Sequence, residues 1–441
     1  MIKIAKKIVF ILFGCHLMVY SHLLRAELMI EITEGVQSAH TIAVVPFASP
    51  MGEQLKEDVA QVIGNDLARS GYFKVLDKAQ MLTSPSQPAQ VKFRNWEALG
   101  QDYLVIGRVS KDNNLYHVQM SLFDVYKKEQ LKGLRVTVEA RVTVEASALR
   151  MAAHYLSDAI YAKLTGIPGI FTSRIAYVTS ELNGQHKTKY NLYVADYDGA
   201  NAISIAQSKE PIMSPAWSPH ADKIAYVSFE NKVSEIFVQT LATGERKSIA
   251  KYKGINGAPA WSPDGKQLAL TLSKGGNSDI YILTLANKSL RQLTKSLAID
   301  TEAAWSPDGK KILFTSDRGR RPQLYIMASN GQSVAERITF DGDYNARGSF
   351  SADGKSIVMV QGVQGNYRIA VQNVASRTTK VLSDGPNDES PSFAPNGQVI
   401  IYARRKGNHD ILATVTLDGA SKQDIRHRGG MVREPAWAPR K

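Results

Sequence analysis

The segment from Pro259 to Leu270 reads PAWSPDGKQLAL, and related segments recur throughout the second half of the chain. The others are PAWSPHADKIAY from Pro215, AAWSPDGKKILF from Ala303, GSFSADGKSIVM from Gly348, PSFAPNGQVIIY from Pro391 and a short PAWAP from Pro435. Their aromatic residues lie 44, 44, 45, 43 and 44 positions apart: Trp217, Trp261, Trp305, Phe350, Phe393 and Trp437. A constant period of this length indicates one structural unit repeated along the chain.

Each repeat has the pattern of four short strands. The aromatic segment is followed by a turn, then by alternating apolar runs such as Lys223–Val227, Ile280–Leu283 and Leu290–Leu293. In the turn at Ser306–Gly309, proline fixes one backbone dihedral, aspartate bonds to the local backbone, and glycine adopts a conformation that other residues avoid. Repeats of about 44 residues, each with four strands joined by tight turns, are typical of β-propeller blades.

The two ends of the repeat region predict how the ring closes. The last aromatic segment, Pro435–Pro439, has no strand after it, whereas Arg174–Val178 has the form of a second strand without an aromatic segment before it. Pairing of these two segments would give six complete blades and leave no incomplete blade with an open edge. We therefore expect residues 173–441 to form an all-β six-bladed β-propeller, closed by pairing of the C-terminal strand with the first propeller strands.

The chain before the ring has a mixed α/β pattern, so we expect an N-terminal α/β domain at residues 27–165 and a linker at residues 166–172. The apolar patterns predict strands at Thr41–Phe47, Phe73–Leu76, Tyr103–Val109 and His117–Val125, and helices at Gly52–Ser70 and Ala146–Leu164. The hexamer RVTVEA occurs at Arg135–Ala140 and again at Arg141–Ala146. This duplication predicts a lengthened strand or a longer approach to the second helix.

Residues 1–26 have the features of a secretory signal peptide. A basic head precedes an apolar stretch too short to span a bilayer stably, and Ala26 stands before the change in polarity at Glu27. The alternative is a lipoprotein, because Leu12–Cys15 resembles a lipidation box, but the chain stays apolar after Cys15. Cys15 is the only cysteine, so cleavage after Ala26 leaves no disulfide, thiolate zinc site or cysteine nucleophile. We expect no membrane span in the mature protein.

Length, composition and charge narrow the class of protein. A chain of 441 residues exceeds what one hydrophobic core usually organises. With 44% hydrophobic and 22% charged residues, the composition is that of a folded protein. The formal net charge of +13 permits an anionic partner, but no run of five like charges occurs in the mature chain. We therefore expect a solvated basic surface and no binding of nucleic acid.

Catalytic signals are weak throughout the sequence. It contains no HExxH, GxSxG, phosphate-loop or dinucleotide motif, and its nine histidines do not cluster at metal spacing. Asp341–Asn345 resembles a calcium loop, but Ala346 and Ala352 stand where that loop needs glycine and glutamate. We expect no catalytic residue, cofactor or metal, and a platform that binds other proteins. The alternative is a periplasmic propeller enzyme, lactonase-like or peptidase-associated, which predicts acidic or histidine ligands around a metal in the channel.

The residues just before each aromatic segment are expected to meet at one mouth of the central channel. Polar and charged residues recur there although strand structure does not require them, which favours a partner loop that enters the mouth. The six tips are Met213–Ser214, Asn256–Ala258, Asp300–Glu302, Asn345–Arg347, Asp388–Ser390 and Arg433–Glu434.

Several segments resemble the TolB family, in order along nearly the whole mature chain. They are IAVVPF, KLTGIPGIF at Lys163–Phe171, RIAYV, NLYVADYDG, MSPAWSP, NGAPAWSPDG and SDRGRRPQLY at Ser316–Tyr325. The resemblance implies a non-enzymatic periplasmic adaptor of the Tol-Pal system, which supports outer-membrane integrity and envelope constriction during cell division in Gram-negative bacteria. It also implies a monomer with two partners, the peptidoglycan-associated lipoprotein Pal at the propeller and the C-terminal domain of TolA at the N-terminal segment.

The resemblance and the tips together predict the binding residues. For Pal, the positions that match the family are Asn256, Gly257, Ala258, Thr301 and Glu302, and the tips add Arg347, Asp388, Glu389 and Glu434. For TolA they are the residues of an N-terminal arm: Glu27, Leu28, Met29, Ile30, Glu31 and Ile32. We expect this arm either to add as an edge strand to a partner sheet or to fold back on its own domain. If Pal favours the docked arm, linkage requires that TolA, by favouring the released arm, weakens Pal binding equally.

Overall fold

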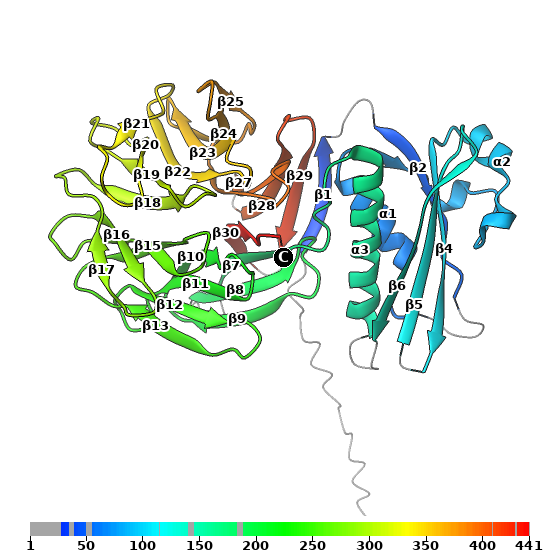
Figure 1. Cartoon of the computed structure of the whole chain (residues 1–441), viewed down its shortest axis with the longest axis horizontal. Coiled ribbons are helices and arrows are strands. Elements are labelled where there is room, and N and C mark those ends of the chain that lie inside the picture. The colour runs from blue at the N-terminus through cyan, green and yellow to red at the C-terminus, as the bar shows by residue number, and fades with distance from the viewer. Residues whose placement is uncertain are drawn as a thin grey trace, which may run out of the picture.

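The computed structural model describes residues 28–34, 39–49, 55–113, 115–139, 145–182, 188–407, 409–427 and 430–440. A ring of β-sheets lies beside a smaller domain in which helices cover one sheet (Figure 1). The predicted signal peptide and Glu27 lie outside the described residues. Among the helices described, none combines the length and the apolar character needed to cross a membrane.

The ring consists of six antiparallel blades of four strands each. Blade 1 contains β30 (Met431–Trp437), β7 (Arg174–Leu182), β8 (Thr188–Asp196) and β9 (Ile203–Ser208). Blade 2 contains β10 (Ile212–Trp217), β11 (Lys223–Ser228), β12 (Glu235–Thr240) and β13 (Arg246–Ala250). Blade 3 contains β14 (Asn256–Trp261), β15 (Gln267–Leu272), β16 (Asp279–Thr284) and β17 (Leu290–Gln292).

The other three blades repeat this arrangement. Blade 4 contains β18 (Asp300–Trp305), β19 (Lys311–Ser316), β20 (Gln323–Ala328) and β21 (Glu336–Arg337). Blade 5 contains β22 (Tyr344–Phe350), β23 (Ser356–Val363), β24 (Asn366–Asn373) and β25 (Thr379–Val381). Blade 6 contains β26 (Asp388–Phe393), β27 (Val399–Lys406), β28 (His409–Thr416) and β29 (Lys422–His427). In every blade the strand with the aromatic segment is at the inner edge.

The ring closes where the two ends of the repeat region meet. Strand β30 pairs antiparallel with β7, with Trp437 opposite Ile175 and Arg433 opposite Val178. The six-bladed fold and the predicted closure by the C-terminal strand are thus confirmed.

The repeated tryptophans connect neighbouring blades. The indole N–H of Trp217 donates to the carbonyl of Ala436 at 3.0 Å, that of Trp261 to Ala216 at 3.1 Å, and that of Trp305 to Ala260 at 3.1 Å. Each acceptor is the residue just before the aromatic of the preceding blade. The period of 44 residues therefore places one inter-blade hydrogen bond at the same height in successive blades.

The N-terminal domain has a five-stranded sheet in the order β3-β2-β4-β5-β6. Its strands are β2 (His40–Val44), β3 (Phe73–Val75), β4 (Tyr103–Asp112), β5 (Leu115–Asp124) and β6 (Glu129–Glu139). Its helices are α1 (Val59–Arg69), α2 (Phe93–Ala98) and α3 (Glu145–Thr165), and two 3₁₀ turns lie at Lys78–Gln80 and Pro88–Gln90. Helices α1 and α3 lie between this sheet and the propeller (Figure 1). One buried apolar cluster joins Leu67, Leu156 and Ile160 with Ile175, Tyr177 and Trp437 of the ring.

Three local features differ from the sequence-based expectation. Helix α1 begins at Val59, after residues 55–58 that are not helical, because the Asp58 side chain accepts a hydrogen bond from the Gln61 N–H and caps the first turn. Helix α2 was not expected, and β6 was expected only in so far as a strand at the first RVTVEA copy was one of the two alternatives. The first RVTVEA copy lies at the end of β6 as far as Glu139, and Ala140 and most of the second copy lie outside the described residues.

The N-terminal arm forms β1 (Leu28–Glu34), which pairs antiparallel with β29 and adds a fifth strand to blade 6. Ile30 lies opposite Ile425 and Glu31 opposite Asp424. The arm thus folds back, but on the propeller and not on its own domain. The reason is that the outer strand of a blade has backbone donors and acceptors that no neighbouring strand of the ring uses, and β29 faces the N-terminal domain (Figure 1).

Candidate functional site

Every inner strand contains a bulge three residues before its aromatic. At this position the register shifts against the second strand in all six blades, and the backbone is left-handed with φ between +44° and +56°. The six residues are Ser214, Ala258, Glu302, Arg347, Ser390 and Glu434. Non-glycine residues rarely adopt this conformation, which costs roughly 1 kcal/mol or more for each. A bulge also redirects its side chain.

The six bulged residues line one cavity of about 640 Å³ at the mouth of the channel. Gly257 and Thr301 line it as well, and Pro215, Pro259 and Pro435 contribute apolar surface. Six sequence-distant strands thus present one residue each to a single space. We call this space the mouth cavity.

Charged groups in the mouth cavity are centred on Arg347. Its Nε lies 3.0 Å from Glu302 Oε1, its backbone N–H donates to Glu302 Oε2 at 3.1 Å, and its guanidinium donates to the Ser390 hydroxyl. The carboxylate of Glu434 accepts a hydrogen bond from the Ser214 N–H and lies 3.9 Å from the Arg347 guanidinium. Burial opposes the charge of Arg347, but Glu302, Glu434 and Glu389 raise its pKa above the usual value. Arg347 is therefore a fixed cation beside the axis.

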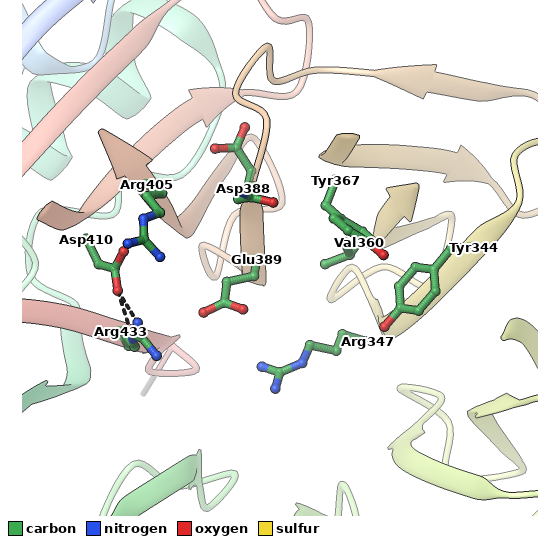
Figure 2. A pocket seen from close by; sticks show the side chains of 10 residues that line it. Tyr344, Arg347, Val360, Tyr367, Asp388, Glu389, Arg405, Asp410 and Arg433 are labelled. Atoms are coloured by element: carbon green, nitrogen blue, oxygen red, sulfur yellow. Dashed lines mark hydrogen bonds and ion pairs between the residues drawn. The ribbon is translucent and has the colours of Figure 1, made fainter. Parts of the chain in front are cut away.

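A second, polar pocket of about 440 Å³ adjoins the mouth cavity and shares Arg347 with it. Figure 2 shows Tyr344 and Tyr367 on one side, Arg405, Asp410 and Arg433 on the other, and Glu389 between them. Arg433 Nε donates to Asp410 Oδ2 at 2.5 Å. We call this space the side pocket.

A different position, five residues before the aromatic, faces into the blades. It is buried in all six, and its polar members bond to nearby loops and strands: Asn256, Asp300, Asn345 and Asp388. The Asn256 side chain bonds to the backbone of Tyr252 at 2.8 Å, and Asp388 accepts from Arg404 Nε at 3.0 Å. These hydrogen bonds hold the tips in place from within the blades.

The structure divides the predicted Pal-binding residues into three groups. Gly257, Ala258, Thr301, Glu302, Arg347 and Glu434 line the mouth cavity, and Glu389 lines the side pocket. Asn256 and Asp388 border these spaces, but their side chains are buried in hydrogen bonds within the protein. Whether any of them contacts Pal stays a prediction.

Sequence reasoning did not select several residues that complete the site. Ser214 and Ser390 were within the tips and share the position three residues before the aromatic, but only the structure shows that this position is the bulge. Tyr344 begins the inner strand of blade 5, one residue before the tip Asn345–Arg347, whereas Tyr367 and Arg405 come from β24 and β27. No repeat position distinguished them in the sequence.

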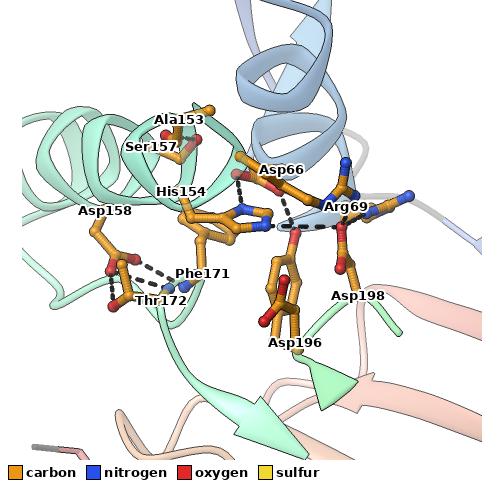
Figure 3. Close-up of polar contacts among 12 residues, drawn as sticks. Asp66, Arg69, Ala153, His154, Ser157, Asp158, Phe171, Thr172, Asp196 and Asp198 are labelled. Carbon is orange, nitrogen blue, oxygen red and sulfur yellow. Dashed lines mark hydrogen bonds and ion pairs between the residues drawn. The ribbon is translucent and has the colours of Figure 1, made fainter. Parts of the chain in front are cut away.

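A buried charged cluster joins the N-terminal domain to the ring, and we call it the joint (Figure 3). His154 Nδ1 lies 2.8 Å from Asp66 Oδ2, and the Tyr197 hydroxyl donates to Asp66 Oδ1 at 2.7 Å. Asp198 accepts from Arg69 at 3.1 Å and also from Arg150. Asp66 and Arg69 belong to α1, Arg150 and His154 to α3, and Tyr197 and Asp198 follow β8 of blade 1.

The charges of the joint stabilise one another. Burial opposes protonation of His154, but the hydrogen bond and charge of Asp66 and the charge of Asp198 raise its pKa. Burial likewise opposes ionisation of Asp198, but His154, Arg150 and Arg69 lower its pKa. Asp66, His154 and Asp198 have ligand atoms within 4.8 Å of one another, as a metal site would. Because two arginines already bond to Asp198, we interpret the joint as a contact between domains.

The arm connects to the joint through β29. Gln423 of β29 lies opposite Ile32 of the arm, and its side chain donates to the Arg69 carbonyl at the end of α1. The predicted TolA-binding residues Leu28 to Ile32 thus lie in a strand that the propeller already pairs.

Comparisons with known proteins give consistent relatives over more than nine-tenths of the chain. A model of the TolB beta propeller domain matches residues 161–441, and a model of the TolB amino-terminal domain matches residues 28–131. The Tol-Pal system protein TolB of Xanthomonas oryzae pv. oryzae (strain MAFF 311018) is 53% identical over 93% of each chain. That of Xanthomonas campestris pv. campestris (strain B100) is 52% identical over the same shares. The crystal structure of TolB from Acinetobacter baumannii has a TM-score of 0.86 and 41% identity, and covers 94% of this chain and 100% of its own.

Proposed function

This chain belongs to the TolB family, and on that premise we propose that it is a non-enzymatic periplasmic adaptor of the Tol-Pal system. Its mouth cavity and side pocket bind Pal, and its N-terminal arm binds TolA. By joining these partners it supports outer-membrane integrity and envelope constriction during cell division.

One observation carries the proposal for the mouth cavity. All six inner strands hold a non-glycine residue in a left-handed bulge, and all six of these residues line the same space. Strain of this kind persists only where the surrounding structure enforces it, and it is concentrated at binding and catalytic sites. Five of the six redirected side chains are polar, and prolines add apolar surface to the same space, a combination that suits an inserted protein segment.

Binding to Pal is tested with purified partners by isothermal titration calorimetry. Glu302→Lys places a cation beside Arg347 and should weaken Pal binding by about 100-fold, because the charge pair at the centre of the site is lost. The matched control is Lys310→Glu, in the exposed turn at the other end of the same blade. If both variants bind Pal like the wild type, the mouth cavity is not the Pal site.

Binding of TolA to the arm requires strand exchange. The arm pairs with β29 in this structure. It must therefore leave blade 6 before it can add to TolA as an edge strand. Deletion of Glu27–Ile32 should abolish capture of the TolA C-terminal domain while the thermal unfolding of the ring stays cooperative. Undiminished capture by the deletion variant would place the TolA site elsewhere.

A chain of charges supports coupling between the two sites. Asp388 at the side pocket bonds to Arg404, Arg404 lies 4.0 Å from Asp424, and Asp424 lies opposite Glu31 in the arm. Release of the arm would change the surroundings of Asp424 and thereby the support of Asp388. Pal affinity measured with and without Glu27–Ile32 tests this, and an unchanged affinity rejects the coupling.

A further inference from the structure

We propose that the side pocket receives a basic side chain, lysine or arginine, from the segment of the partner that enters the mouth cavity. Glu389 is the residue that pairs with its charge. This inference rests on the proposed function, because it assigns a chemistry to the partner that occupies the same site.

The side pocket has the shape that a long cationic side chain needs. It is built from blades 5 and 6 and from β30 of blade 1, so it opens toward the channel across two blade boundaries. Tyr344 and Tyr367 meet edge to face, with ring centres 5.2 Å apart, and Val360 is buried behind them. An aliphatic stem can lie along these rings, and aromatic faces attract a cation.

Most charges in the side pocket already have a partner within the protein. Asp388 bonds to Arg404, Asp410 to Arg433, and Arg347 to Glu302. Within the described part of the chain, no hydrogen bond or ion pair is found for the carboxylate of Glu389 or the guanidinium of Arg405. Figure 2 shows the Glu389 carboxylate directed into the space between Arg433 and Arg347. Glu389 is exposed and is therefore available to a ligand.

The balance of charge favours a cation over an anion. Five carboxylates line the mouth cavity and the side pocket against three guanidinium groups: Glu302, Asp388, Glu389, Asp410 and Glu434 against Arg347, Arg405 and Arg433. Arg404, which pairs with Asp388 from outside this lining, reduces the surplus to one carboxylate. This acidic surplus stands out in a chain whose formal net charge is +13. Electrostatic complementarity at an interface selects the sign of the partner's charge.

The test measures Pal binding to full-length mature variants by calorimetry at two salt concentrations. Glu389→Gln keeps the size of the side chain and should weaken binding about tenfold, with a smaller dependence on salt. Tyr367→Leu should weaken binding about threefold. The matched control is Glu245→Gln, in an exposed turn between β12 and β13, which should bind as the wild type does.

Each outcome decides between explanations. If wild-type protein does not bind Pal, the proposed function fails before the side pocket is tested. If wild-type protein binds Pal and Glu389→Gln binds equally well, the inference is wrong while the proposed function stands. If Arg405→Gln weakens binding and Glu389→Gln does not, the pocket receives a carboxylate and the inference is overturned. Recovery of Glu389→Lys binding by a Pal variant in which one basic residue is changed to glutamate would identify the partner side chain.

Discussion

The side pocket and the joint both contain arginines and carboxylates, yet they use them in opposite ways. In the joint, Asp66 and Asp198 are fully buried and their oxygens accept bonds from both domains. In the side pocket, Glu389 and Arg405 are exposed, and within the described residues no hydrogen bond or ion pair is found for the charged group of either. Buried charges need partners in the same molecule, whereas exposed charges are solvated by water and remain available to a partner molecule. Internal pairing thus distinguishes a contact that holds two domains together from a surface prepared for a ligand.

The largest effect should come from breaking the joint. Asp198→Asn keeps the shape of the side chain but leaves Arg69 and Arg150 without their shared counter-charge. We expect the free energy of unfolding to fall by about 3 kcal/mol, as when one partner of a buried pair is removed. Chemical denaturation measures this. Asp343→Asn, in an exposed pair with Arg321, is the control and should change stability by less than about 1 kcal/mol. Equal losses would show that the joint is no stronger than a surface pair.

The joint should also make stability depend on pH. The pKa of His154 is raised in the folded protein, so its contribution is fully present below the unfolded value of about 6.5. That contribution is lost as the pH rises through the folded pKa. Wild-type protein should therefore exceed His154→Gln in stability by more at pH 6 than at pH 9. Asp198, whose pKa is lowered, loses its contribution only at acidic pH. Parallel stability curves between pH 6 and pH 9 would contradict the role of His154.

At the mouth, relief of strain should stabilise the protein, which is the reverse of the result at the joint. Ala258 has φ of +44°, and Ala258→Gly removes the steric cost of this conformation. We expect the free energy of unfolding to rise by up to about 1 kcal/mol. Ala304→Gly, where β18 resumes its pairing with Leu313 after the bulge, should lower it by about 0.5 to 1 kcal/mol because glycine loses more backbone entropy on folding. The same sign for both variants would refute strain at the bulge.

The smallest effect on stability should come from the arm. Deletion of Leu28–Glu34 exposes β29 but removes no strand of the ring, so the midpoint of unfolding should hardly move. Hydrogen exchange should instead become faster for amides of β29 and stay unchanged for β28. Unchanged exchange in β29 would mean that β1 adds no protection there.

Sequence reasoning located most of the N-terminal strands but misplaced the start of α1. The Asp58 cap is a local signal that could have been read, since aspartate precedes an apolar helical pattern there. The first part of strand β6 was missed because polar and charged residues interrupt its apolar ones, as in Glu129–Lys132. This segment is a strand because it pairs antiparallel with β5, a contact that its own sequence pattern does not reveal.

The sequence by itself determined the ring: the number of blades, their four-strand pattern and the pairing of β30 with β7. The ring could be predicted because turn residues and alternating apolar residues are local signals, and the same signals occur in each repeat. Only the tertiary structure decided which tip residues face the channel, since the left-handed bulge holds serine, alanine, glutamate or arginine and no glycine marks it. It also decided that the arm docks on β29 and that Asp66, His154 and Asp198 meet in the joint. Such contacts join residues up to several hundred positions apart, and no local pattern encodes which distant surface will supply the partner.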